Sequence, residues 1–172
     1  MRFIFSLIFV ILISGYTFSQ INRMEIRGYR ASVDLGSNFN ANGSNASRIG
    51  LSTTQGYMFN PNIFVGAGVQ IDILTSPPRW YNHLAVPLFV AAKWNILSNK
   101  ITPILQGRTG YSIVGNKGHY LSFSAGVQYY LKNDNAIKFS VGTEFQQYNI
   151  SYLGESFHEL NNGPFVRIGF EF

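Results

Sequence analysis

The sequence contains no cysteine and few charged residues. The absence of cysteine among 172 residues excludes a disulfide framework, a lipid-modified N-terminal cysteine and thiolate chemistry. Charged residues make up only 12% of the chain, about half of the roughly 25% that is usual in soluble domains. The net charge is +5, but the basic residues are scattered singly, so the contiguous basic surface that nucleic-acid binding needs is missing. We therefore expect no nucleic-acid partner.

Long apolar runs are missing beyond the first twenty residues. The N-terminus holds one basic residue, an apolar run from Phe3 to Ser14, and small residues at a plausible cleavage site. This pattern is typical of a secretory signal peptide, and the run is too short for a transmembrane helix. We expect residues 1–19 to be a signal peptide and residues 20–172 to form one domain. The near-neutral mean hydropathy of the chain also argues against a helical membrane protein.

The chain is instead rich in aromatic residues, at 16%, and in two-residue alternation. The final segment, Pro164–Phe172, shows the pattern most clearly. Its apolar residues are Val166, Ile168, Phe170 and Phe172, and the residues between them are Arg167, Gly169 and Glu171. This is a β-strand with one apolar and one polar face. A soluble sheet edge that ends in Phe-x-Phe would promote aggregation, whereas a closed membrane barrel leaves no such edge exposed.

Eight segments of the mature chain have strand character. The predicted strands are Arg23–Leu35, Arg48–Phe59, Ile63–Leu74, His83–Asn95, Ile101–Val114, His119–Leu131, Ala136–Asn149 and Pro164–Phe172. The connections after the second, fourth and sixth strands are short, and three of the other four are long: Gly36–Ser47, Thr75–Asn82 and Ser151–Asn162. Outer-membrane barrels have short periplasmic turns and longer external loops. The sequence therefore predicts an all-β fold, an eight-stranded antiparallel up-and-down transmembrane β-barrel.

Aromatic residues fall near both ends of the predicted strands. Tyr57, Trp94, Tyr129, Phe170 and Phe172 would lie at the periplasmic ends, and Trp80, Tyr81, Tyr111, Phe145 and Tyr148 at or near the opposite ends. Two such levels are typical of the aromatic belts at the two membrane interfaces.

Nine charged residues share the inward face of the predicted barrel. They are Arg30, Asp34, Asp72, Lys93, Arg108, Lys138, Glu144, Arg167 and Glu171. The interior of an eight-stranded barrel is just wide enough to be filled by side chains, and charges buried there must pair. Similar depths on adjacent strands predict the pairs Lys138–Glu171 and Glu144–Arg167. We expect a plug of paired charges, with a narrow ion path as the functional alternative.

Glycines in the predicted strands would let a small barrel bend and leave room inside. We assign this role to Gly66, Gly68, Gly107, Gly110, Gly126, Gly142 and Gly169. The Gly66-x-Gly68 spacing lacks the third glycine and the following helix of a nucleotide-binding fingerprint.

The middle of the chain carries two proline-containing strands joined by a short turn. They read L-A-V-P-L-F-V-A-A-K-W (Leu84–Trp94) and K-I-T-P-I-L-Q-G-R-T-G-Y (Lys100–Tyr111). With these motifs the chain, from about Gln20 to its end, resembles the small outer-membrane β-barrel proteins of Bacteroidota, a PorT-like, outer-membrane protein β-barrel domain family with an OmpA-like eight-stranded barrel. The third external connection is shorter here than is usual in such barrels. The resemblance implies location in the outer membrane of a Gram-negative bacterium. It also implies that Phe170 and Phe172 form the signal read by the barrel-assembly machinery.

Catalysis and metal binding have one candidate segment, G-E-S-F-H-E-L (Gly154–Leu160). Ser156 and His158 are parts of a nucleophilic triad, and Glu155, His158 and Glu159 could bind a divalent cation. However, sequence neighbours rarely reach triad geometry, and the G-x-S-x-G elbow is missing. The other histidines, His83 and His119, fall at strand ends. We therefore expect no enzymatic activity, no metal and no cofactor.

Together these patterns favour an integral outer-membrane barrel with a structural or accessory role through its external loops. A small pore for ions or for small or lipophilic solutes is the alternative. A soluble barrel of the lipocalin type fits less well, because its apolar residues would face the cavity. The expected partners are outer-membrane lipid and lipopolysaccharide, the barrel-assembly machinery during biogenesis, and a protein partner in the outer membrane.

Overall fold

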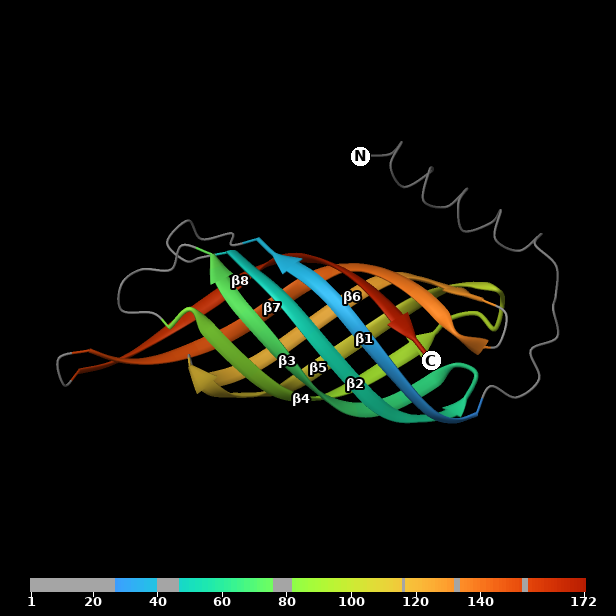
Figure 1. Cartoon of the computed structure of the whole chain (residues 1–172), viewed down its shortest axis with the longest axis horizontal. Helices are drawn as coiled ribbons and strands as arrows, with labels where there is room; N and C mark the ends of the chain where they lie inside the picture. Colours follow the sequence, from blue (N-terminus) through green and yellow to red (C-terminus); the bar gives the residue numbers. More distant parts are fainter. Residues whose placement is uncertain (1–26, 40–46, 76–81, 116, 132–133, 153–154) are drawn as a thin grey trace.

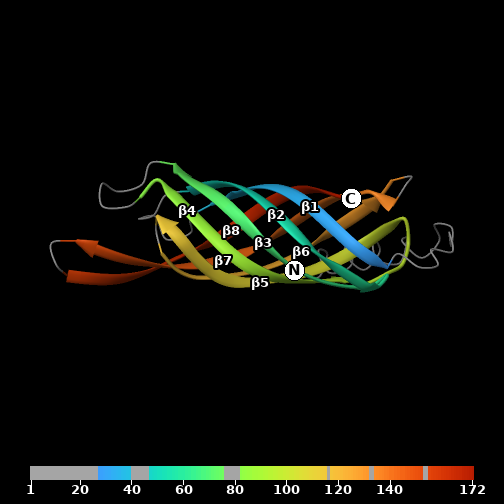
Figure 2. The same cartoon turned by 60° about the horizontal axis from the view of Figure 1, so that its bottom comes forward.

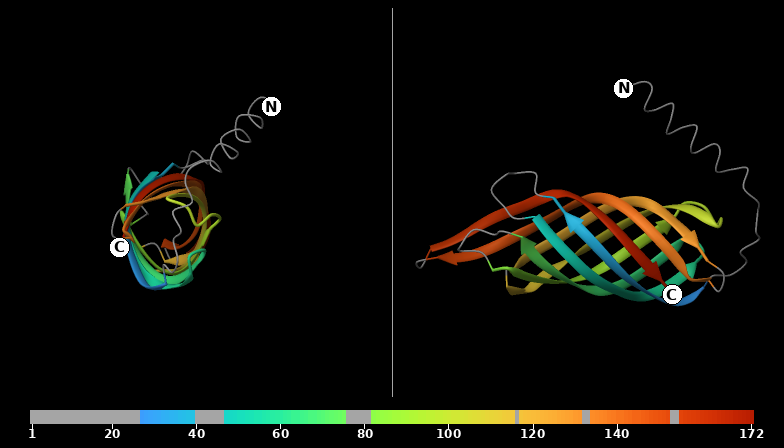
Figure 3. Two further views of the ribbon diagram at one scale, coloured as in Figure 1. Left: turned by 90° about the vertical axis from the view of Figure 1, so that its right-hand side faces the viewer. Right: turned by 45° about the horizontal axis from the view of Figure 1, so that its top comes forward.

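Eight antiparallel strands close into a barrel in the computed structural model, in which each strand pairs with its chain neighbours and β8 pairs with β1 (Figure 1). The strands are β1 (Gly28–Asn38), β2 (Ser47–Asn60), β3 (Ile63–Thr75), β4 (Leu84–Asn95), β5 (Ile101–Gly115), β6 (Gly118–Tyr130), β7 (Ala136–Tyr152) and β8 (Glu155–Glu171). The end-on view shows the closed ring (Figure 3). The fold is therefore the one predicted from the alternating sequence pattern.

The structure describes residues 27–39, 47–75, 82–115, 117–131, 134–152 and 155–172, and for 148–152 and 155–159 it describes the backbone alone. The predicted signal peptide lies outside these residues. Within them, no helix has the length and apolar character needed to cross a membrane.

The short turns lie at the same end of the barrel as the C-terminus (Figure 1). The turn between β2 and β3 is fixed by Asn60, whose Oδ1 accepts hydrogen bonds from the backbone N–H groups of Asn62 at 2.9 Å and Ile63 at 2.8 Å. An asparagine that caps its own turn in this way favours a tight connection. In β4, Pro87 lies at a shift in the pairing register with β5, where its missing N–H is tolerated.

The prediction of a long loop over Ser151–Asn162 is wrong. β7 continues to Tyr152 and β8 begins at Glu155, so this segment is mostly strand. A polar residue is suited to an inward-facing strand position here, and Asn161 is fully buried. At the end of the barrel opposite the short turns, two connections are therefore long rather than three. They join β1 to β2 and β3 to β4.

The β7–β8 hairpin extends beyond the rest of the barrel (Figure 2). Pairing between β6 and β7 ends at Gln146, and pairing between β8 and β1 ends at Phe165. Beyond these positions, β7 and β8 still pair with each other as far as Tyr152 and Glu155. The hairpin tip is therefore a two-stranded ribbon whose outer edges pair with no other described strand.

Candidate functional site: the filled barrel interior

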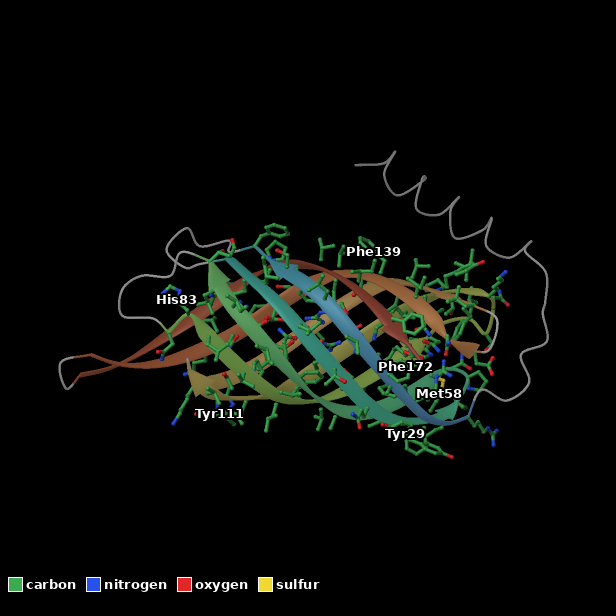
Figure 4. The ribbon with its side chains drawn as sticks, in the orientation of Figure 1. Tyr29, Met58, His83, Tyr111, Phe139 and Phe172 are labelled. Carbon is green, nitrogen blue, oxygen red and sulfur yellow. The ribbon has the colours of Figure 1, made fainter. Side chains whose placement is uncertain are left out.

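The outer surface of the barrel is apolar at mid-height. Leu35, Ile71, Val90, Phe139 and Ile168, on five different strands, are each about half exposed, and Phe139 points away from the barrel in Figure 4. A monomeric soluble protein rarely exposes a contiguous apolar surface of this extent, whereas a transmembrane barrel needs one.

Aromatic residues mark both ends of this apolar surface. Tyr29 and Phe172 lie near the end that holds the C-terminus, and Tyr111 lies near the opposite end (Figure 4). Tyr57 and Trp94 are also exposed, at 50% and 52%, at the end of the barrel that holds the short turns. Of the other predicted belt residues, Trp80 and Tyr81 lie outside the described residues and Tyr148 has only its backbone described.

All nine charged residues predicted to face inward are buried, each with 8% exposure or less. A tenth, Arg48 on β2, was missed and is 1% exposed. Its position could have been found, because Tyr57 was placed outward and Arg48 has the opposite parity on the same strand. The charged interior and apolar exterior exclude the soluble lipocalin-type alternative, which requires the reverse.

The middle of the interior is organised around Asp34 on β1. Its carboxylate accepts a hydrogen bond from Arg108 Nη2 at 2.7 Å and forms an ion pair with Lys138 Nζ at 2.9 Å. Arg108 also donates to Ser52, and Lys138 also donates to Ser32. The group therefore links four strands: Asp34 and Ser32 come from β1, Ser52 from β2, Arg108 from β5 and Lys138 from β7.

A second group of charges centres on Glu144 on β7. Its carboxylate pairs with Arg48 at 2.9 Å and with Arg167 at 3.2 Å, and it accepts a hydrogen bond from the Tyr120 hydroxyl at 3.0 Å. The predicted pair between Glu144 and Arg167 is thus present. Arg48 also lies 4.0 Å from Asp72, so the missed arginine joins both carboxylates of this group.

The third group surrounds Glu171 near the C-terminal end. Its carboxylate pairs closely with Lys93 and lies 3.5 Å from Arg30. The predicted pair between Lys138 and Glu171 is wrong, because the register places Ala136 opposite Glu171. Lys93 comes from β4, so this ion pair crosses the barrel instead of joining adjacent strands.

Gly169 explains the partner that Lys138 takes instead. In the barrel wall Gly169 lies directly between Lys138 on β7 and Asp34 on β1. A Cβ atom at position 169 would overlap the Asp34 carboxylate and lie 2.6 Å from Lys138 Cε. The missing side chain therefore leaves the space in which the two charged groups meet.

Gly107 does not have the inward role assigned to it from the sequence. Its position alternates with the buried Gln106 and Arg108 on β5, and the exposed Phe123 is its partner on β6. Gly107 therefore faces the membrane. At inward glycines such as Gly110 and Gly142, by contrast, an added Cβ atom would lie within 3 Å of neighbouring backbone.

Aromatic and apolar side chains fill the space between the charged groups. Met58, Phe64, Tyr130 and Ala136 form a buried cluster, which lies at the C-terminal end of the barrel, where Met58 is labelled (Figure 4). Phe89, Ala91 and Tyr120 form another. The second cluster lies beside the charged group around Asp34, because Ala91 is the strand partner of Arg108 and the Arg108 guanidinium lies over the Phe89 ring.

The described interior holds six cationic side chains and four carboxylates, once Arg48 is included. Three of the cations lie over aromatic faces. Arg167 Cζ is 4.3 Å from the ring centroid of Phe165, Arg108 Cζ is 4.8 Å from that of Phe89, and Lys93 Nζ is 5.5 Å from that of Phe64. Such contacts stabilise cations that are removed from water. The aromatic rings therefore partly offset the excess of cations over carboxylates in the interior.

The candidate catalytic and metal-binding segment is only partly described. Its backbone from Glu155 is part of β8, and the side chains of Ser156, His158 and Glu159 lie outside the described atoms. Elsewhere in the described part of the chain, no three His, Asp or Glu residues cluster as metal ligands. The His119 ring packs edge-on against Tyr111 at 5.4 Å, a surface contact rather than a ligand arrangement.

A closed eight-stranded wall, an apolar exterior between aromatic belts and a charged, filled interior define an integral outer-membrane β-barrel. No protein-family model and no curated protein sequence matches the chain. Among solved structures it is similar to Neisserial surface protein A, with 12% identity and a TM-score of 0.59 over 84% of this chain and 95% of that one. Outer membrane protein W of E. coli aligns with 17% identity and a TM-score of 0.48, over 86% of this chain and 99% of that one. AlkL aligns with 12% identity and a TM-score of 0.46, over 89% and 90%. At these identities the likeness concerns the fold.

Proposed function

We propose that the protein is a non-conducting outer-membrane barrel with a structural or accessory role, and that it is not an enzyme. The filled interior is the observation that carries this proposal. Conduction needs a continuous polar path, whereas here ion pairs alternate with the buried apolar clusters around Met58 and Phe89. A cavity beside Asp72 and Glu144 has a volume of about 10 Å³, which is room for one water molecule.

Single-channel recording in planar bilayers tests the closed interior. We expect the wild-type protein to give no unitary current steps. The double variant Met58→Ala/Phe64→Ala removes the bulk of the apolar cluster at the C-terminal end, and we expect it to admit water and give small steps or noise. Phe139→Ala, a truncation on the lipid-facing side, is the matched control and should stay silent. Reproducible unitary steps from the wild type would contradict the proposal.

A small pore remains the second candidate because the described interior carries six cations against four carboxylates. An anion path would follow from this imbalance. Under a salt gradient, a pore of this kind would give a reversal potential of the sign expected for chloride. The same recording therefore distinguishes a closed barrel from an anion-selective one.

Partner contacts are proposed at the end of the barrel opposite the C-terminus. β1 and β3 end there and β2 and β4 begin there, so the predicted loops Gly36–Ser47 and Thr75–Asn82 connect strands at this end, which also carries the β7–β8 hairpin. A gentle-detergent pull-down from the native outer membrane should recover a stoichiometric protein partner. Replacement of residues 148–159 by a two-residue turn should abolish this recovery, while the barrel still folds. Recovery of a monomer alone from the wild type would contradict an accessory role.

The finer family assignment is also a proposal. It rests on the Leu84–Trp94 and Lys100–Tyr111 motifs, which resemble those of PorT-like outer-membrane β-barrel proteins of Bacteroidota. Phe170 and Phe172, with their rings stacked at 6.1 Å and exposed outward, are proposed as the signal for the barrel-assembly machinery. Phospholipid and lipopolysaccharide would surround the apolar exterior.

A further inference from the structure

The lipid-facing surface contains an apolar groove of about 810 Å³ that crosses β4, β5 and β6. Its floor consists of the small residues Ala92, Gly107 and Ala125. Ala92 lies opposite Gly107, and Ala125 lies opposite Leu105, so the small residues are neighbours on three adjacent strands. Much of the remaining outer surface carries large aliphatic and aromatic side chains.

Larger residues form the walls of this groove. Trp94 and Leu105 lie opposite each other on β4 and β5, and Phe123 and Val141 line it from β6 and β7. Trp94, Phe123 and Val141 are each about half exposed. The result is a concave apolar surface whose bottom is at the level of the barrel backbone.

Packing within the barrel does not require the glycine at the floor. A Cβ atom at position 107 would meet only ring atoms of Phe123, at 3.7 Å, which is an ordinary contact. By contrast, a Cβ at Gly110 on the same strand would overlap the Leu88 carbonyl oxygen. A glycine is needed at position 110 because the backbone of β4 approaches closely there. At position 107 the missing side chain instead makes the groove on the outer surface deeper.

An exposed cation lies outside the groove lining, in the turn that joins two of the strands forming its floor. Lys100 is in the exposed turn between β4 and β5, the strands that carry Ala92 and Gly107, and its Nζ lies 5.2 Å from the ring centroid of Tyr129. Seven residues separate Lys100 from Gly107, about 23 Å along a strand, or roughly 18 Å of depth at a tilt of ~40°. This is close to the ~15 Å that one leaflet contributes to a bilayer core about 30 Å thick.

We infer that this groove is a specific site for one anionic phospholipid of the periplasmic leaflet. Its phosphate pairs with Lys100, and one acyl chain lies over Ala92, Gly107 and Ala125. Charge at one end and a concave apolar floor along the rest match the chemistry of a phospholipid. A second barrel would present a convex apolar surface and has no need of the cation. The site is independent of whether the barrel conducts or binds a protein partner.

Trp94 provides a direct reporter, because it lines the groove and the chain contains only one other tryptophan, Trp80. In a Trp80→Phe background, the full-length barrel would be reconstituted in phosphatidylcholine vesicles that contain a low mole fraction of brominated phosphatidylglycerol. We expect Trp94 fluorescence to be quenched severalfold more than random lipid contact at that mole fraction predicts.

Two changes to the groove should reduce the quenching to the random level. Ala92→Leu/Gly107→Leu fills the floor, and Lys100→Gln removes the cation. Thr53→Leu, an outward-facing change on β2 away from the groove, is the matched control and should quench like the Trp80→Phe background. The heat-dependent shift in gel mobility that folded barrels show would establish that each variant is folded.

Quenching in the Trp80→Phe background that merely follows the mole fraction of brominated lipid would overturn the inference. So would equal quenching in the groove-filled and control variants. Formation of a dimer that the Ala92→Leu/Gly107→Leu change disrupts, with random quenching throughout, would assign the groove to a second copy and would also contradict the lipid site. Native mass spectrometry should find one retained phosphatidylglycerol on the control and none on the filled variant.

Discussion

Replacement of Asp34 by asparagine should destabilise the barrel more than most other single isosteric changes. The carboxylate is 1% exposed and pairs with Arg108 at 2.7 Å and Lys138 at 2.9 Å. The substituted amide would keep nearly the same volume but would leave two buried cations without a counter-charge. Removal of one partner of a buried ion pair typically costs about 3–5 kcal/mol. Since each 1.4 kcal/mol is a factor of ten, the folded-to-unfolded ratio should fall by roughly two to four powers of ten.

Urea titration of the barrel in lipid vesicles, followed by tryptophan fluorescence, would measure this change in the free energy of unfolding. Asp134→Asn is the control, because Asp134 lies in an exposed turn, where the same chemical change should cost less than ~0.5 kcal/mol. A second change, Lys138→Met, should recover part of the loss in the Asp34→Asn background, since the two side chains interact directly. A loss below about 1 kcal/mol for Asp34→Asn would refute the reasoning that buried pairing holds the interior together.

Three further predictions concern the barrel wall. Gly110→Ala should destabilise the fold by about 1–3 kcal/mol through overpacking, whereas Gly107→Ala should change the unfolding free energy little; equal effects in urea titration would contradict the glycine assignments. Phe139→Arg, at a lipid-facing position at mid-height, should cost about 2–4 kcal/mol, and a neutral result would argue against membrane exposure there. Phe172→Ala should slow assembly by purified barrel-assembly machinery without altering spontaneous folding in detergent; unchanged assisted assembly would reject the proposed signal.

Alternation of residue types was sufficient to predict which face of most strands lies inside. Because lipid and a filled interior impose opposite requirements on neighbouring residues, charged side chains such as Arg108 and Lys138 could be assigned to the interior from the sequence. Arg48 was missed only because β2 has a weaker pattern, in which Thr53 and Gln55 occupy outward positions.

The pairing of the charges could not be predicted to the same degree. Alternation gives the face of a residue but not its register, and Lys138 meets Asp34 only because Gly169 leaves space between them. Lys93 reaches Glu171 across the interior, a contact that depends on barrel closure. Gly107 was misassigned because a glycine gives no hydrophobic signal of its own, and its face has to be taken from neighbours such as Gln106.

The length of the hairpin formed by β7 and β8 was underestimated for a related reason. Asparagines and a glycine near Asn161 are typical of loops in soluble proteins. In a barrel the inward face accepts polar residues along the full strand, so composition is a weaker guide to where a strand begins. The pairing of Gln147 with Leu160 shows that β7 and β8 remain paired beyond the barrel rim.

Cysteine accessibility along β6 would show whether the barrel is closed and its interior filled. The chain has no native cysteine, and Ser122 and Ser124 face inward while Leu121 and Phe123 face outward. Single cysteines at these positions would be exposed, in vesicles, to a small water-soluble thiol reagent and to a lipid-soluble maleimide. We expect the lipid-soluble reagent to label positions 121 and 123, and neither reagent to label 122 or 124. Rapid labelling of 122 and 124 by the water-soluble reagent would reveal a water-filled lumen and would contradict this expectation.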